Sequence, residues 1–385
     1  MSARSTAQRN YWDKQYYPDD ESINMSYERK NIQAMTAYVS GEQPDAQDVI
    51  KLNTNENPYP PSAKIQQLTA NFNIDSLRRY PPPTANRFRD IAATIHKVGR
   101  GNIIATRGGD ELLRLLITTF VDPRETIGMT DPTYSLYPVL AQIQDCKVFK
   151  VPLNEDWSLP QDFAKQINAA GCKLTLLVNP HAPSGQLLNT RQLSVIADEL
   201  NSVLLIDEAY VDFVVDDYDA IPLIFKHDNV VILRTLSKGY SLAGLRFGYG
   251  IGPESIITPM VDKTRDSYNL DLLCQQIAEA ALFDRSHALK NCQLVIEQRG
   301  RMEAAFSEHG FEALKSQANF LLLTVTNELQ NRSGKTAEDI YQALKIRNIL
   351  VRYFPEERLQ NKLRITIGTK DENSAILEAL GTILA

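Results

Sequence analysis

Four short groups of reactive or phosphate-binding residue types each follow a predicted strand. An acid, Asp207, ends the run VLLID, and an amine, Lys238, comes shortly after the run NVVILRT. Two glycines and an acid, residues 108–110, follow NIIATR at the start of a predicted helix, and the loop NPHAPSG, residues 179–185, follows KLTLLV. Because ligands bind at the carboxyl ends of the strands in open parallel sheets, we expect these four groups to meet in one site.

Together these groups suit a phosphorylated, electron-poor aromatic aldehyde, and pyridoxal phosphate fits that description. Its aldehyde needs a primary amine, which Lys238 supplies. A buried carboxylate such as Asp207 keeps the ring nitrogen protonated, so that the ring can withdraw electrons. Tyr210, three positions further on, can donate its hydroxyl hydrogen to the ring oxygen O3′. Taken singly, each residue is more simply explained as a helix cap, a solvated lysine or a turn; only the combination predicts the cofactor.

The cofactor phosphate needs several hydrogen-bond donors. Backbone N–H groups at a helix N-terminus are suitable, and Gly109 and Asp110 are placed to offer them. Thr235, Ser237 and Arg246, all within RTLSKGYSLAGLR, add hydroxyl and guanidinium donors.

Seven apolar runs between residues 102 and 252 predict the sheet that positions these groups. They are NIIATR, ETIGMT, KVFKVPL, KLTLLV, VLLID, NVVILRT and RFGYGIG. Several are apolar throughout, which is typical of strands covered by helices on both faces. Two segments between these runs, residues 111–120 and 190–200, each show one apolar stripe at helical spacing. This order predicts an α/β fold with a mainly parallel seven-stranded sheet and right-handed crossovers.

The pattern of predicted strands and helices changes along the chain, which predicts a division into domains. Residues 58–271 are expected to form a large cofactor-binding domain. Residues 272–385 are rich in helices and contain the strand-like runs ANFLLLTV, ILVRYF and KLRITIG, so they predict a smaller α+β domain. Residues 29–57 include VIKLNTNENP and are expected to pack with that domain. Residues 1–28 are rich in Tyr, Asp and Ser and are interpreted as an N-terminal arm.

Composition excludes several classes of protein. The 385 residues carry 41 Lys and Arg against 47 Asp and Glu, a formal charge of -6, which argues against a nucleic-acid binder. The four cysteines are far apart without a CxxC, and the five histidines show no paired-ligand spacing, so neither disulfides nor a metal site is expected. No apolar run approaches the ~18 residues of a membrane span, and the N-terminus lacks a signal-peptide core. We therefore expect a soluble enzyme in the cytoplasm.

Nine motifs occur in the order that a known family shows. They are KLNTNENPYPPS, RRYPPP, RGGDELL, DPTYSLY, LLIDEAYVDF, RTLSKGYSLAGLRFGYGIG, SQANFLLL, ILVRYF and LRITIGT. On these motifs the chain, from about residue 29 to its C-terminus, resembles the fold-type I pyridoxal-phosphate aminotransferases of class I and II. Within them it is most similar to the histidinol-phosphate aminotransferases.

The resemblance implies roles around the cofactor. Lys238 would bind it covalently, Asp207 would pair with the pyridine nitrogen, and Tyr210 would donate to O3′. Arg246, Ser237 and Thr235 would hold the phosphate, with Tyr134 of DPTYSLY stacked on the ring. The residues expected to contact the cofactor are thus Tyr80, Gly109, Asp110, Tyr134, Asn179, His181, Asp207, Tyr210, Thr235, Ser237, Lys238 and Arg246.

The resemblance also implies a substrate site and a homodimer. Arg364 of KLRITIGT would hold the anionic end of the substrate by a two-pronged contact, and Arg352 of ILVRYF would assist. Asn55 of NENP would border the substrate. Tyr80 of RRYPPP would reach the cofactor phosphate of the neighbouring subunit, so that the active sites are shared between subunits.

One loop departs from the family pattern. Most relatives read NPNNPTG where this chain reads NPHAPSG, and the second asparagine of the pair donates to O3′; here that position is Ala182. The O3′ environment would then depend on Tyr210, with help from Asn179 or His181, and losing a donor raises the proton affinity of the bound cofactor. A subgroup that lacks this asparagine and still transaminates well is an equal alternative, and His181 is more simply explained as a packed loop histidine.

The arm is a second departure. Its aromatic and acidic residues could close over the active-site mouth and favour a cationic substrate, although a plain extension is the commoner case. They are Tyr11, Trp12, Tyr16, Tyr17, Asp19, Asp20 and Glu21.

Three functions remain open from the sequence. The leading hypothesis is an aminotransferase that moves an amino group between an amino acid or amino-phosphate and a 2-oxo acid. The runner-up is elimination, cyclodehydration or decarboxylation on the same scaffold, for example of a hydroxylated arginine. The third, a non-catalytic module that has kept the scaffold, is disfavoured because Lys238 is present.

Overall fold

The structure is a computed structural model that describes residues 26–38, 41–44 and 48–385. The aromatic and acidic residues predicted to form a flap, from Tyr11 to Glu21, lie outside the described residues. The described residues divide between two units: residues 26–35 belong to the first, and the described residues from 36 to 385 belong to the second. In the first unit the structure describes the short helix α2 (Lys30–Gln33).

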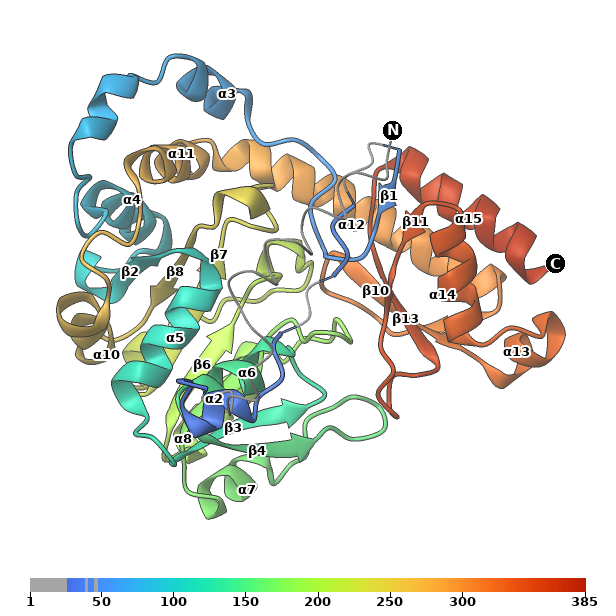
Figure 1. The fold of residues 1–385 in the computed structure, drawn as a ribbon, viewed down its shortest axis with the longest axis horizontal. Helices are drawn as coiled ribbons and strands as arrows, with labels where there is room; N and C mark the ends of the chain where they lie inside the picture. Colours follow the sequence, from blue (N-terminus) through green and yellow to red (C-terminus); the bar gives the residue numbers. More distant parts are fainter. Residues whose placement is uncertain (1–25, 39–40, 45–47) are drawn as a thin grey trace, which may run out of the picture. The chain divides into compact units, whose positions relative to one another are not determined.

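A seven-stranded sheet is the main element of the second unit, and all seven predicted strands belong to it (Figure 1). Its order is β2 (Ile103–Thr106), β8 (Gly248–Ile251), β7 (Val230–Thr235), β6 (Val203–Asp207), β5 (Cys172–Val178), β3 (Thr126–Asp131) and β4 (Lys147–Pro152). Only β8 runs antiparallel to its neighbours, so the predicted mainly parallel sheet is confirmed.

Helices cover both faces of the sheet, which explains why its strands are apolar throughout. Alternate residues of a strand point to opposite faces. Leu204 and Ile206 of β6 pack into the core that includes α4 (Asn86–His96), α7 (Phe163–Ala169), α8 (Thr190–Glu199) and α11 (Leu272–Phe283). Leu205 packs into the opposite core, with α5 (Gly108–Phe120) and α6 (Leu136–Ile143). Asp207 shares the face of Leu205, so the carboxylate emerges on the α5 side.

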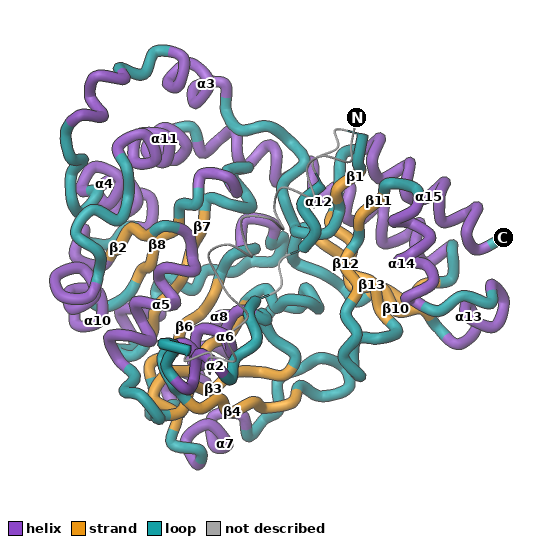
Figure 2. The backbone as a smooth tube through the Cα atoms, viewed as in Figure 1, coloured by secondary structure: helices purple, strands orange, loops and turns teal. Residues whose placement is uncertain are grey.

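A smaller sheet with its own helices follows in sequence (Figure 2). Four antiparallel strands have the order β12 (Arg352–Tyr353), β13 (Lys362–Thr366), β10 (Phe320–Val325) and β9 (Phe311–Ala313). A separate parallel pair joins β1 (Ile50–Lys51) to β11 (Ile349–Leu350), so the segment before the large sheet does pair with the C-terminal region. The helices of this region are α12 (Arg285–Glu308), α13 (Asn327–Ser333), α14 (Ala337–Ile346) and α15 (Lys370–Leu384).

The remaining helices are short, and one predicted helical stretch is divided. They are α3 (Ala63–Ala70), α9 (Leu223–Lys226) and α10 (Glu254–Pro259). The predicted helical stretch 272–308 consists of α11 and α12, which Asp284 separates. The Asp284 carboxylate accepts hydrogen bonds from Ser62 and Lys64 at the start of α3. A domain boundary near residue 271 stays a prediction. Among the described residues, no helix is long and apolar enough to cross a membrane.

Candidate active site

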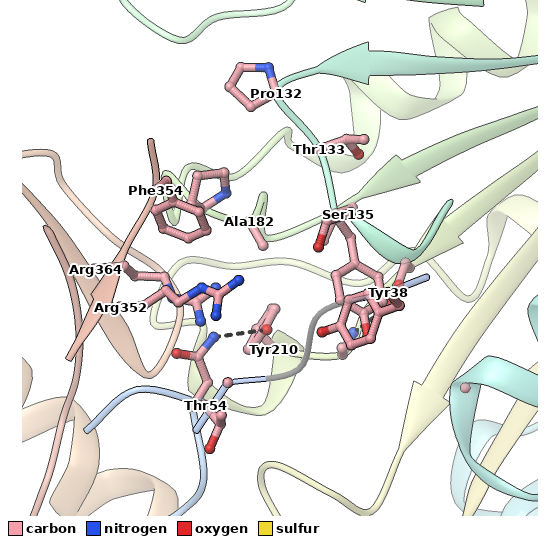
Figure 3. Close-up of a pocket in the computed structure, with 18 of the residues that line it drawn as sticks. Tyr38, Thr54, Pro132, Thr133, Ser135, Ala182, Tyr210, Arg352, Phe354 and Arg364 are labelled. Atoms are coloured by element: carbon pink, nitrogen blue, oxygen red, sulfur yellow. Dashed lines mark hydrogen bonds between the residues drawn. The ribbon is translucent and has the colours of Figure 1, made fainter. Parts of the chain in front are cut away.

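A cavity of about 860 Å³ lies where the strand ends of the large sheet meet residues of β12 and β13. Most of the predicted site residues line it. They are Asn55, Gly109, Asp110, Tyr134, Asp207, Tyr210, Thr235, Ser237, Lys238, Arg246, Arg352 and Arg364. Figure 3 shows Tyr210, Ala182 and the arginines 352 and 364 around this cavity. The parallel register brings the groups together, since Asp207 pairs with both Val178 and Leu233.

Asp207 is a buried carboxylate that accepts hydrogen bonds from neutral donors. The hydroxyl of Tyr137 donates to Oδ2 at 2.7 Å, and the backbone N–H of Ala209 donates to Oδ1 at 3.1 Å. Burial raises the pKa of Asp207 from 3.8 to about 6. A cationic ring N–H in the cavity would relieve this cost, because it would pair with the buried charge.

Tyr137 is a site residue that the sequence reasoning missed. It is fully buried in α6, and its hydroxyl hydrogen bonds Asp207 across 70 positions of sequence. A signal was available in the motif DPTYSLY, where Tyr137 follows Tyr134 by three residues and therefore projects from the same side of a helical turn. The two tyrosine rings meet edge to face, with centroids 5.5 Å apart.

Lys238 presents its amine to the cavity. Its Nζ donates to the backbone oxygen of Thr54 at 2.9 Å. Burial, followed by the positive charge of Arg364, lowers the pKa of Lys238 from 10.5 to about 7. A large fraction of this amine is therefore neutral near pH 7, which is the form that acts as a nucleophile or base.

Tyr210 is held by a chain of buried side chains. Asn55 is 1% exposed, and its Nδ2 donates to the Tyr210 hydroxyl at 3.0 Å, the hydrogen bond that Figure 3 marks with a dashed line. The Oδ1 of Asn55 accepts from the Thr366 hydroxyl at 3.1 Å. Burial raises the pKa of Tyr210, so the phenol stays protonated at neutral pH. Asn55 thus contacts Tyr210 through the amide that was expected to border the substrate.

Donors for a phosphate gather at the N-terminus of α5. Gly109 and Asp110 lie in the first turn of this helix, which follows β2, and Arg246 Nη2 contacts Asp110 Oδ2 at 3.1 Å. The hydroxyl of Thr235 donates to Ser237 Oγ at 2.9 Å. Gly108 has a φ of +74°, a backbone conformation that favours glycine, and a Cβ there would lie 2.8 Å from Arg246 Nη2 and displace the guanidinium.

Two arginines form the opposite end of the cavity. Arg364 Nη2 donates to the backbone oxygen of Asn53 at 3.0 Å, while its buried Nε has no hydrogen-bond partner among the described residues. Its guanidinium lies 5.3 Å from the ring centroid of Phe320 and 5.6 Å from that of Phe354, and Arg352 lies 5.3 Å from Phe354. Burial lowers the pKa of Arg364, which an incoming anion would offset.

Three predicted cofactor residues do not line the cavity of this chain. The Asn179 side chain is committed to the backbone of Leu188 and to the hydroxyl of Tyr218. His181 is buried, with its ring nitrogens bonded to Ser184 Oγ at 2.8 Å and to the Pro132 oxygen at 3.0 Å. Tyr80 is 80% exposed and stacks on Tyr268, with ring centroids 4.5 Å apart.

The lining residues fit pyridoxal phosphate. The cavity offers an amine, a buried carboxylate that lacks a cationic partner among the described residues, and a phenol. Hydroxyl and guanidinium donors surround a helix N-terminus nearby. Each group meets one chemical requirement of that cofactor: imine formation, ring protonation, a hydrogen bond to the ring oxygen O3′, and binding of phosphate.

Comparison with known proteins agrees with this chemistry. The family model for aminotransferase class I and II matches residues 47–380. The chain is 39% identical to histidinol-phosphate aminotransferase 1 of Nostoc sp. over 93% of its length and 98% of that protein's. It is 35% identical to the histidinol-phosphate aminotransferase of Clostridium botulinum strain Okra, over 92% and 97% of the two chains.

Solved structures show the same fold. The crystal structure of histidinol-phosphate aminotransferase from Sinorhizobium meliloti in complex with pyridoxal-5'-phosphate superposes with a TM-score of 0.84 and 21% identity, covering 94% of this chain and 98% of that one. The enzyme from Clostridium acetobutylicum gives a TM-score of 0.78 and 22% identity, covering 87% and 99%.

Fold, cavity and family model define the class: the chain belongs to the class I and II aminotransferases of fold type I. It is a pyridoxal-phosphate-dependent aminotransferase. These comparisons favour transamination over the elimination and cyclodehydration that the sequence left open.

Proposed function

We propose that this aminotransferase takes histidinol phosphate as its amino donor and a 2-oxo acid as its acceptor. Relatives named histidinol-phosphate aminotransferase match more than nine-tenths of the chain. The single observation that carries the proposal is that Arg364, whose buried Nε is unpaired among the described residues, lines the cavity together with Arg352. Two guanidinium groups at one end suit a phosphate monoester, while Lys238 is available for the amino end.

Two groups of cavity residues would hold the cofactor, one at its ring nitrogen and one at its phosphate. Asp207 would hold the proton of the ring nitrogen, with Tyr137 keeping the carboxylate in place. The second group would bind the phosphate: Gly109, Asp110, Thr235, Ser237 and Arg246. When bound, pyridoxal phosphate supplies a ring that withdraws electrons from the substrate's Cα.

Lys238 would move the proton that transamination requires. Its Nζ would take the proton from the substrate Cα and return it two atoms further along, on the carbon beyond the amino nitrogen, which needs a neutral amine. A pKa near 7 provides that form at neutral pH. The backbone oxygen of Thr54, which accepts from Nζ at 2.9 Å, holds the amine at the cavity wall.

We also propose a cytoplasmic homodimer with two domains, residues 58–271 and the combination of 29–57 with 272–385. Tyr80 and Tyr268 are 80% and 46% exposed and stacked, so this aromatic pair is available to a partner subunit. The four cysteines are free and buried, which is compatible with a reducing compartment. Light scattering would test the dimer, and Tyr80→Ala should weaken cofactor retention without changing the Lys238 side of the site.

A substrate panel tests the proposed donor. Purified enzyme would be given histidinol phosphate, histidinol, histidine and phenylalanine with 2-oxoglutarate, and glutamate formation would be followed. Histidinol is the matched control, because it differs from the proposed donor only in the phosphate. We expect kcat/KM to be at least about 10²-fold higher with the phosphate, since a charge-assisted hydrogen-bond pair contributes about 1.5–3 kcal/mol per bond. Equal values for both compounds would overturn the proposed donor while leaving the aminotransferase class intact.

A further inference from the structure

The loop after β5 offers the cavity no hydrogen-bond donor from its side chains. Ala182 lines the cavity with a methyl group and is 5% exposed. The amide of Asn179 is directed away, to Leu188 and Tyr218, and both ring nitrogens of His181 are engaged by Ser184 and Pro132. Neither neighbour therefore compensates for the alanine. A donor to the phenolic oxygen of the cofactor has to come from another part of the chain.

The opposite wall contains a hydrogen-bond chain that ends at the cavity. The Thr366 hydroxyl accepts the backbone N–H of Asn55 at 3.0 Å and donates its hydrogen to Asn55 Oδ1 at 3.1 Å. Because the amide oxygen is engaged by Thr366, the amide nitrogen of Asn55 faces Tyr210 and donates to its hydroxyl at 3.0 Å.

The direction of this chain decides where the Tyr210 hydrogen points. The phenol accepts from Asn55 and donates to no group in the described part of the chain, so its single hydrogen is available to an acceptor in the cavity. Asn55 itself has little freedom to turn. It is 1% exposed, has a φ of 57°, and its backbone oxygen accepts from Asn319 Nδ2 at 2.9 Å.

We propose that Thr366 and Asn55 are positioning residues that aim the Tyr210 hydroxyl into the cavity and thereby supply the donor that Ala182 lacks. The inference rests on the proposed roles of Lys238 and Tyr210. A hydrogen bond accepted by Tyr210 also strengthens the one it donates, because the two polarise each other. Loss of the relay weakens the donor to the cofactor and raises the apparent pKa of the bound cofactor.

Charged and titratable groups from other elements also face Tyr210. Replacing Asn55 or Thr366 leaves all of these groups in place. Arg364 comes from β13, Asp207 from the end of β6, and Lys238 from the segment after β7, with its Nζ 6.0 Å from the Tyr210 ring centroid. The tyrosines 38, 134 and 137 interact with it as well. A change seen on altering Asn55 or Thr366, which carry no charge, is therefore attributable to the hydrogen-bond chain.

The test is a pH titration of the visible absorbance of the cofactor-loaded enzyme. Asn55→Ala and Thr366→Val should raise the apparent pKa of the bound cofactor by about half a pH unit to one pH unit, the equivalent of one neutral hydrogen bond. Tyr210→Phe should raise it by about one to two pH units, because the bond that is lost is to a charged oxygen.

Combined variants separate a relay from a merely structural role. If Asn55 acts only through Tyr210, then adding Asn55→Ala to Tyr210→Phe changes the apparent pKa no further. Adding Ala182→Asn to Tyr210→Phe should lower it again, because an amide donor returns on the opposite wall. Thr324→Val is the matched control: Thr324 lies in β10, bonds Lys362 Nζ and does not line the cavity, so the wild-type pKa is expected.

Three outcomes would overturn the relay. They are an unchanged pKa in both Asn55→Ala and Thr366→Val, full additivity of Asn55→Ala with Tyr210→Phe, and no recovery with Ala182→Asn. Circular dichroism and a thermal melt of each variant identify those that fail to fold, and Thr366→Val then stands in for Asn55→Ala. Failure of the proposed function looks different, since wild-type enzyme would then titrate as expected but would show equal kcat/KM for histidinol phosphate and histidinol.

Discussion

Replacing Asp207 by asparagine should stabilise the cofactor-free protein while weakening its hold on the cofactor. The carboxylate is 5% exposed, and its pKa rises from 3.8 to about 6 because it is buried. The folded-state pKa lies above the unfolded value, so the charged carboxylate destabilises the fold, and stability falls as pH rises from about 4 to 6. At pH 8 the cost is about 3 kcal/mol, and at pH 5 it is about half of that.

Thermal melts of cofactor-free protein measure this directly. Asparagine keeps the volume of the side chain and removes the buried charge, so Asp207→Asn should melt higher than wild type at pH 8. The expected difference is on the order of 4 °C for a chain of this length, at about 2.1 cal/mol/K per residue. At pH 5 the difference should shrink to about half. Asp228→Asn is the control: Asp228 is an exposed aspartate that lies outside the cavity, so its melting temperature should stay that of wild type.

The same variant should bind the cofactor more weakly, although its cofactor-free form is more stable than wild type. A neutral amide cannot pair with a protonated ring nitrogen, so the dissociation constant should rise by about 10- to 100-fold, as for a lost hydrogen bond between charged groups. The reasoning is refuted if Asp207→Asn melts no higher than wild type at pH 8, or if it binds the cofactor as tightly as wild type does.

Three further predictions follow from the site and its support. Lys238→Ala should lose the visible absorbance of the lysine-bound cofactor and lower kcat by at least about 10²-fold, as for loss of a general base; a spectrum that matches wild type would contradict this assignment. Arg364→Lys should raise KM for the anionic donor more than Arg352→Lys does, because Arg364 has a buried, unpaired Nε edge, and initial rates with histidinol phosphate check the order. Arg234→Met should lower the free energy of unfolding in urea by about 3–5 kcal/mol without shifting the cofactor spectrum. The reason is that Glu208, 1% exposed, would lose its 2.5 Å ion pair and stay buried. A loss below about 1 kcal/mol would contradict this role of the ion pair.

Sequence patterns by themselves determined the main sheet and the residues at its strand ends. Apolar runs of four to seven residues are local signals, so the strands and the residues that end them, such as Asp207 and Thr235, can be located before any contact is known. Lys238, Tyr210 and Gly109 follow strand ends and can be located in the same way. These residues do line one cavity, because parallel strands bring their carboxyl ends to one edge.

Which polar atoms face the cavity was decided only by the tertiary structure. Asn179 sits at a strand end like Asp207, yet its amide is taken up by Leu188 and Tyr218, and no local pattern distinguishes the two cases. Tyr137 meets Asp207 across 70 positions, and Asn55 meets Tyr210 across 155. Hydrogen bonds at such separations depend on how whole elements pack, whereas the periodicity of a sequence reports only on the element that contains it.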